Sequence, residues 1–100
     1  MTYELAFKPS ALAEWRALDA TVREQFKKVL LRRLEMPHVP AARLHGLPDC
    51  YKIKLRKLGY RLVYQVEDQA LCVTVVAVGK RERDAVYLMA KLALKQREQE

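Results

Sequence analysis

Residues 51–66 combine a regular alternation of side chains with an unusual density of positive charge. Tyr51, Ile53 and Leu55 alternate with lysines, and a second alternating run follows Gly59. Successive side chains of a strand point to opposite faces, so the pattern predicts a hairpin with one apolar and one cationic face. The cationic face would carry Lys52, Lys54, Arg56 and Arg61. Because charges of one sign repel at short range, this face is expected to bind a negative ligand such as a phosphate chain.

Internal cleavage of RNA is a reaction that such a surface could perform. The 2′-OH next to the scissile phosphate can act as nucleophile, given a base, a cationic clamp and an acid for the leaving 5′-oxygen. A lysine has a reference pKa of ~10.4, but neighbouring positive charges favour its neutral form, which makes Lys54 a candidate base. Arg61 and Arg81 suit the clamp, because arginine stays charged and binds phosphate through planar contacts. Tyr87 could stack on a base or transfer a proton, although the pattern alone favours a helix tyrosine packed on the sheet, and it leaves base and acid unassigned.

The whole chain has the composition of one basic globular domain spanning residues 1–100. It contains 19 Lys+Arg against 12 Asp+Glu, a net charge of +7, and 51% hydrophobic residues. This balance favours a polyanionic partner such as RNA, DNA, a ribosome or an acidic protein. Neither a membrane-spanning run nor a signal peptide is apparent, so the expected compartment is the cytoplasm. Cys50 and Cys72 lack metal or redox spacing, no metal or cofactor is predicted, and Cys72 is expected to be a buried thiol.

The first half of the chain predicts a strand and two helices. Alternation over residues 2–7 indicates a short strand, and Pro9 suits the first turn of a helix that places Trp15 in the core. A second helix is expected from about residue 19, with a capping box formed by Thr21 and Glu24, and it would end before Pro37. Its apolar stripe is Val22, Phe26, Val29, Leu30 and Leu34. Its charged residues, read as a solvated face, are Arg23, Lys27, Lys28, Arg32 and Arg33.

The second half predicts three strands and a helix. A connection over residues 37–50 leads to the cationic hairpin, and residues 70–78 form a strand that is apolar on both faces. A helix follows from about residue 84, and the polar tail beyond about residue 92 is expected to fray. The order β-α-α-β-β-β-α predicts an α+β fold with an antiparallel-rich sheet. The helical hairpin would cover one sheet face, and the cationic face would stay open at least in part.

Several segments together resemble the RelE toxins of bacterial type II toxin–antitoxin pairs, within the RelE/ParE-like fold. They are LHGLPDCYKIKLR (44–56), GYRLVYQ (59–65) and VGKRER (78–83) with Tyr87, and, nearer the start, EWR (14–16) and TVREQ (21–25). The resemblance extends to about residue 92 and includes the cationic and tyrosine positions as well as the apolar pattern.

The resemblance implies a metal-independent, ribosome-dependent endoribonuclease, an mRNA interferase that cuts messenger RNA in the ribosomal A site and so inhibits translation. It implies a RelB-like antitoxin that neutralises the toxin, and contact with operator DNA only through the toxin–antitoxin complex, which represses the shared operon. The family residues that carry the reaction fall on Lys52, Lys54, Arg61, Arg81 and Tyr87. Further contacts with RNA or the ribosome are predicted for Arg56, Lys80, Arg83 and His45.

Two other functions fit the same features. A ParE-type toxin shares the fold but inhibits DNA gyrase, and it should not need a lysine, arginine and tyrosine reaction set on the sheet. A non-catalytic basic module that binds nucleic acid or acts only as a co-repressor would tolerate loss of Tyr87 but not loss of net charge. Cleavage of translated messages in cells that express the chain would separate the three functions.

Overall fold

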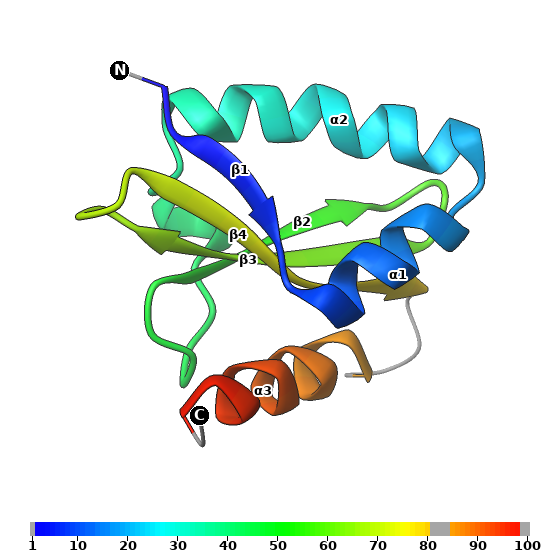
Figure 1. Cartoon of the computed structure of the whole chain (residues 1–100). Coiled ribbons are helices and arrows are strands. Elements are labelled where there is room, and N and C mark those ends of the chain that lie inside the picture. The colour runs from blue at the N-terminus through cyan, green and yellow to red at the C-terminus, as the bar shows by residue number, and fades with distance from the viewer. Residues whose placement is uncertain (1, 81–84, 99–100) are drawn as a thin grey trace.

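A computed structural model of the chain, which describes residues 2–80 and 85–98, shows one sheet between two layers of helix (Figure 1). The strands are β1 (Glu4–Phe7), β2 (Cys50–Leu55), β3 (Tyr60–Glu67) and β4 (Cys72–Lys80). The helices are α1 (Pro9–Ala17), α2 (Ala20–Glu35) and α3 (Ala85–Glu98), with a 3₁₀ turn η1 (Pro40–Ala42). This element order confirms the predicted α+β fold. Within the part of the chain that is described, no helix is both long and apolar enough to cross a membrane.

The sheet has the strand order β1-β4-β3-β2 and mixed direction. Strands β2, β3 and β4 are antiparallel neighbours joined by tight turns, as the sequence predicts. The edge strand β1 pairs parallel to β4, with Phe7 opposite Val75. Parallel pairing requires a crossover connection rather than a hairpin, and the long excursion through α1 and α2 supplies it.

Helices α1 and α2 cover one face of the sheet, which confirms the predicted helical hairpin (Figure 1). Trp15 is only 9% exposed and lies between two other aromatic rings. Its ring centroid is 5.3 Å from that of Phe7 on β1 and 6.2 Å from that of Phe26 on α2. Tilted aromatic contacts of this kind add to the stabilisation from burying the rings. They fix the two helices to each other and to the edge strand β1.

Helix α3 lies on the opposite face, against the central strands (Figure 1). A bulge in β4 supports this second core, because Val75 pairs with Tyr64 and Ala77 pairs with Val63, which leaves Val76 as an extra residue. Val76 and Ala77 therefore both pack beneath α3, whereas Val75 belongs to the first core. The bulge gives β4 the apolar character on both faces that the sequence predicts.

Polar contacts on the α2 side hold β2 and β3 in place, and they correct the prediction made for Arg33. Arg33 is half-buried, and its Nη1 donates to the Tyr64 hydroxyl at 2.9 Å and to the Lys52 carbonyl at 3.3 Å, so it does not belong to a solvated face. Burial raises the pKa of Tyr64, and the hydrogen bond from Arg33 opposes that shift.

At the start of α2 the cap is the Asp19 carboxylate, which accepts from the Thr21 N–H, so the predicted capping box is wrong.

The cysteine prediction is also wrong. Cys72 is partly exposed, because it opens β4 next to the edge strand, where neither core covers it fully. Cys50 is the fully buried cysteine, and burial raises the pKa of its thiol to about 12. At the other end of the chain, α3 continues to Glu98, beyond residue 92, where the sequence predicts a fraying tail.

Candidate active site between the sheet and helix α3

Three residues in register across the sheet form the base of the candidate site. Lys54 on β2 pairs with Arg61 on β3, and Arg61 pairs with Gly79 on β4. Directly paired residues point to the same face, with Cβ atoms about 4.5–5.5 Å apart. Gly79 has no side chain, and helix α3 packs close above it, since a Cβ at this position would lie 3.5 Å from the Val86 side chain. The structure therefore places two predicted reaction residues next to each other.

Tyr87 approaches this row from helix α3. The Arg61 guanidinium carbon lies 5.3 Å from the centroid of the Tyr87 ring, and both side chains are half-buried. A cation over an aromatic face is attracted by the ring, which restricts both partners to a defined geometry. A lysine, an arginine and a tyrosine from three separate elements thus converge on one point.

Lys52 lies one row further along β2, opposite Val63. Its side chain is half-buried on the same face as Lys54, since the two are separated by one residue. The backbone here is rigid on both sides, because the Lys52 carbonyl accepts from Arg33 while Lys52 remains in the β2–β3 ladder. At the hairpin end, Gly59 adopts φ +74° and its N–H donates to the Leu55 carbonyl at 2.8 Å, which closes the turn.

The predicted contact residues are more dispersed. Arg56 and Lys54 line a pocket of about 560 Å³ at the hairpin end together with Thr21 and Gln25, so this pocket opens beside α2 rather than beside α3. Lys80 pairs with Tyr60, and this register turns it to the face opposite Arg61. His45 is exposed in the loop beside Cys50, at the far end of β2 from Lys54. Arg81 and Arg83 lie outside the described residues.

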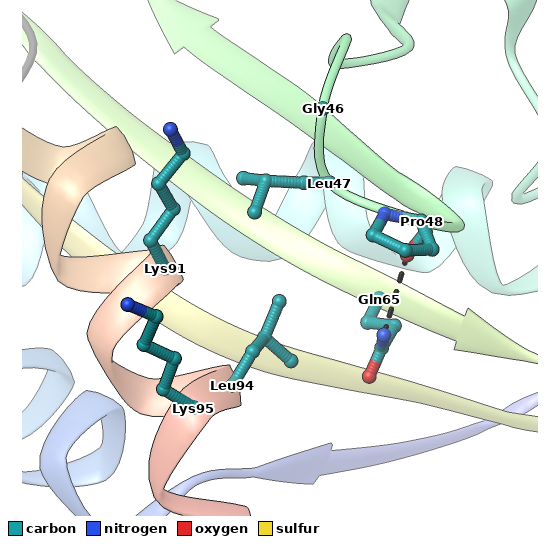
Figure 2. A pocket seen from close by; sticks show the side chains of 7 residues that line it. All are labelled: Gly46, Leu47, Pro48, Gln65, Lys91, Leu94 and Lys95. Carbon is teal, nitrogen blue, oxygen red and sulfur yellow. Dashed lines mark hydrogen bonds between the residues drawn. The ribbon is translucent and has the colours of Figure 1, made fainter. Parts of the chain in front are cut away.

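The sequence reasoning missed a cationic groove that lies beyond Lys52 on the same face. Its volume is about 680 Å³, between the loop before β2 and the C-terminal half of α3 (Figure 2). Lys91 and Lys95 stand on its helical wall. The signal was present in the sequence, because Tyr87, Lys91 and Lys95 recur at intervals of four residues and so share one side of a helix. Among residues 2–80 and 85–98, no cluster of three histidine, cysteine or acidic side chains could hold a metal ion.

Comparisons with known proteins find similar proteins over most of this chain. The mRNA interferase toxin RelE of Escherichia coli K12 is 60% identical over 87 residues, which are 87% of this chain and 92% of that protein. The R81A/R83A mutant of E. coli RelE in the free state superimposes with a TM-score of 0.85 at 55% identity, covering 92% of this chain and 97% of that chain. A chain of the intact E. coli RelBE toxin–antitoxin complex matches with a TM-score of 0.78 at 59% identity, covering 81% of this chain and 99% of that chain.

A family match places these similarities in a class. The family described as the ParE toxin of type II toxin–antitoxin system, parDE, matches residues 5–85. Together with the relatives above, this match shows that the chain belongs to the RelE/ParE family of type II toxins.

Proposed function

We propose that this chain is an mRNA interferase, an endoribonuclease toxin that cleaves messenger RNA in the ribosomal A site and so stops translation. The observation that carries the proposal is the contact between Arg61 and Tyr87 directly beside Lys54. Two cations side by side can bind a phosphate, and a phenol next to them can donate or accept a proton. The 60% identical E. coli relative is named for the same activity.

The reaction proceeds by attack of the substrate's own 2′-OH on the scissile phosphorus. A bond forms between O2′ and phosphorus, the bond to O5′ breaks, and the products are a 2′,3′-cyclic phosphate and a 5′-OH. Arg61 stabilises the negative charge that grows on the phosphate oxygens, and Arg81 adds a second guanidinium to this clamp. Lys52, Lys54 and Tyr87 supply the base that takes the 2′-OH proton and the acid that protonates O5′. The reaction residues are all side chains of the protein, so no metal ion or cofactor is required.

Dependence on the ribosome follows from the same residues. A site that relies on lysine and tyrosine for proton transfer gains most when its substrate is held in reactive geometry. Fixing two reacting groups in this way contributes up to about 7–11 kcal/mol. The ribosome holds the A-site codon in a defined conformation, so it supplies the positioning that the toxin lacks on free RNA. Arg56, His45, Lys80 and Arg83 would contact the RNA of the message or the ribosome.

The partner that restrains the toxin is a RelB-like antitoxin. E. coli RelE relatives form a complex with RelB, and a RelB peptide was bound to the R81A/R83A mutant. The +7 charge of this chain would attract an acidic, partly disordered antitoxin segment that folds on binding. The complex of toxin and antitoxin, rather than the toxin alone, would bind operator DNA, and both proteins would act in the cytoplasm.

Inhibition of DNA gyrase is the second candidate, because the matching family is described by its ParE members. We favour RNA cleavage, since gyrase inhibition gives no reason for Lys54, Arg61 and Tyr87 to converge. The test is cleavage of a programmed ribosome by purified toxin, with Arg61→Gln as the variant and Arg16→Gln, an exposed arginine on α1, as the matched control.

We expect wild type and the control to cut the A-site codon, and Arg61→Gln to lose at least tenfold in single-turnover rate while its thermal unfolding is nearly unchanged. Inhibition of gyrase supercoiling without any cut in the message would favour the ParE-type function. A toxin that does neither, yet represses its operon together with its antitoxin, would favour a non-catalytic module.

A further inference from the structure

We propose that the groove lined by Lys91 and Lys95 holds the continuation of the RNA strand that is cleaved at Arg61 and Tyr87. The inference deepens the proposed function and rests on it. It assigns to α3 a role in binding substrate away from the reacting phosphate. The ligand is single-stranded RNA of the message, bound through its phosphates and bases.

The groove and the candidate site lie on the same side of the sheet, at successive positions along the β2–β3 ladder. The sheet face beneath α3 presents three rows, which are Lys54 with Arg61, Lys52 with Val63, and Cys50 with Gln65. At about 3.4 Å per residue, the row with Gln65 lies about 14 Å from the row with Arg61. Helix α3 follows the same course, because the eight residues from Tyr87 to Lys95 rise about 12 Å. Val63 and Cys50 are fully buried beneath α3, so an RNA strand would pass over the β2 side of the helix by way of Lys52, along a path a few nucleotides long.

The two walls of the groove differ in the way that a nucleotide requires. Lys91 and Lys95 stand on the helical wall, whereas Leu47 and Pro48 form the facing loop (Figure 2). Leu94 extends into the space between them (Figure 2). Phosphates can contact the ammonium groups while a base packs against the apolar side chains. The volume of about 680 Å³ is within the range of small-ligand sites.

Gln65 adds a polar group on the floor of the groove. Its amide nitrogen donates to the Pro48 carbonyl at 3.3 Å, which fixes the side chain. The amide oxygen points away from that bond in Figure 2, so it can accept from the amino group of a base. Gly46, at φ +82°, leaves the loop backbone uncovered beside this floor. None of the lining residues that the structure describes here is acidic, so the charge of the groove favours a polyanion.

RNA fits these observations better than a protein partner does. A docking protein helix would need an apolar groove in which to bury its apolar face. This groove has two lysines on one wall, so it does not offer such a surface. An RNA strand already bound at Arg61 reaches Lys52 and then Lys91 without leaving the cationic surface. The charge of the groove and its position beside the candidate site therefore both favour RNA as the ligand.

The test compares a double variant with a matched control. Lys91→Gln with Lys95→Gln removes two charges from the groove, and glutamine has nearly the helix propensity of lysine. Lys27→Gln with Lys28→Gln removes the same charge from exposed positions on α2, on the other side of the sheet. Binding is measured by fluorescence anisotropy with RNA oligonucleotides of three and about eight nucleotides. A single 2′-deoxy nucleotide at the scissile position prevents cleavage.

We expect wild type and the control to bind the longer RNA more tightly than the shorter one, and the groove variant to lose most of that gain. Two lost phosphate contacts lower the slope of log K against log salt by about 1.4, so a fourfold rise in salt weakens the variant's binding ~7-fold less than wild type's. Single-turnover cleavage on saturated programmed ribosomes should stay near the wild-type rate, with a higher half-saturating toxin concentration.

Three results would overturn the inference. The groove variant could retain the full length-dependent gain, or it could lose affinity equally for both lengths, which would reduce the lysines to general charge. It could also bind both RNAs normally and lose affinity only for an acidic antitoxin peptide, which would make the occupant a protein. Failure of the proposed function looks different, because wild type would then leave the programmed message uncut while the length-dependent binding persisted.

Discussion

Replacing Tyr87 by phenylalanine removes one oxygen and keeps the ring over the Arg61 guanidinium. The cation–π contact at 5.3 Å survives in this variant, so the positions of helix α3 and of Arg61 should be preserved. If the hydroxyl transfers a proton, its loss should slow cleavage by ~10²–10⁴-fold, the usual contribution of general acid–base catalysis. Tyr87→Ala also removes the ring contact, which is worth about 0.5–1 kcal/mol at a partly exposed position, or roughly a further two- to fivefold.

The assay is single-turnover cleavage of a programmed ribosome with the toxin in saturating excess, together with a binding titration and a thermal melt. Tyr60→Phe is the matched control, because Tyr60 packs against the first core on the opposite face of the sheet. We expect it to cut at the wild-type rate. Ribosome affinity should change little in every variant, since many lysine and arginine contacts carry it. A Phe variant as fast as wild type, with only Ala impaired, would confine Tyr87 to stacking and leave proton transfer to the lysines.

Three further predictions concern the scaffold around the site. Arg33→Met should lower the free energy of unfolding, measured by urea titration, by about 1–3 kcal/mol, because hydrogen bonds from a charged donor are lost. The control Arg32→Met, at an exposed position of the same helix, should change this free energy by less than about 0.5 kcal/mol. Gly79→Leu should lower the free energy of unfolding by about 1–3 kcal/mol in the same titration, because a Cβ at this position already lies 3.5 Å from the Val86 side chain and a larger group would displace α3; unchanged stability would contradict the packing of α3 over this row. At pH 8, Cys72 should react with a thiol reagent in the native protein and Cys50 should not, because burial both covers Cys50 and raises its pKa to about 12; equal reactivity would contradict the packing beneath α3.

The cationic hairpin could be predicted from local information alone. Side chains alternate with a period of two along any strand, so Lys54 and Arg61 had to share a face once the turn was placed at Gly59. The same reasoning identified the two-sided strand β4, because a run of β-branched residues without polar alternation needs cover on both faces. The resemblance to the RelE toxins then supplied what no periodicity could, which is the reason to select Tyr87 from an otherwise ordinary helix.

Other features depended on contacts between distant segments. The parallel pairing of β1 with β4 joins residues almost 70 positions apart, and no local pattern encodes such a choice. Arg33 looked like any other charge on a helix surface, and it acquired a structural role only because Tyr64 and the Lys52 carbonyl came within reach. The prediction that Cys72 is buried was wrong for the same reason, since burial depends on what packs on top of a residue, and it is Cys50 that α3 covers.

The sequence by itself determined which residues could do chemistry and on which side of each element they lie, because strand and helix periods act over a few residues. Only the tertiary structure decided where α3 crosses the sheet. That crossing brings the Tyr87 ring to Arg61 and puts Lys91 and Lys95 across a groove from Leu47 and Pro48. The position of α3 depends on the bulge at Val76. The bulge turns two successive side chains, Val76 and Ala77, towards the helix, which packs against both.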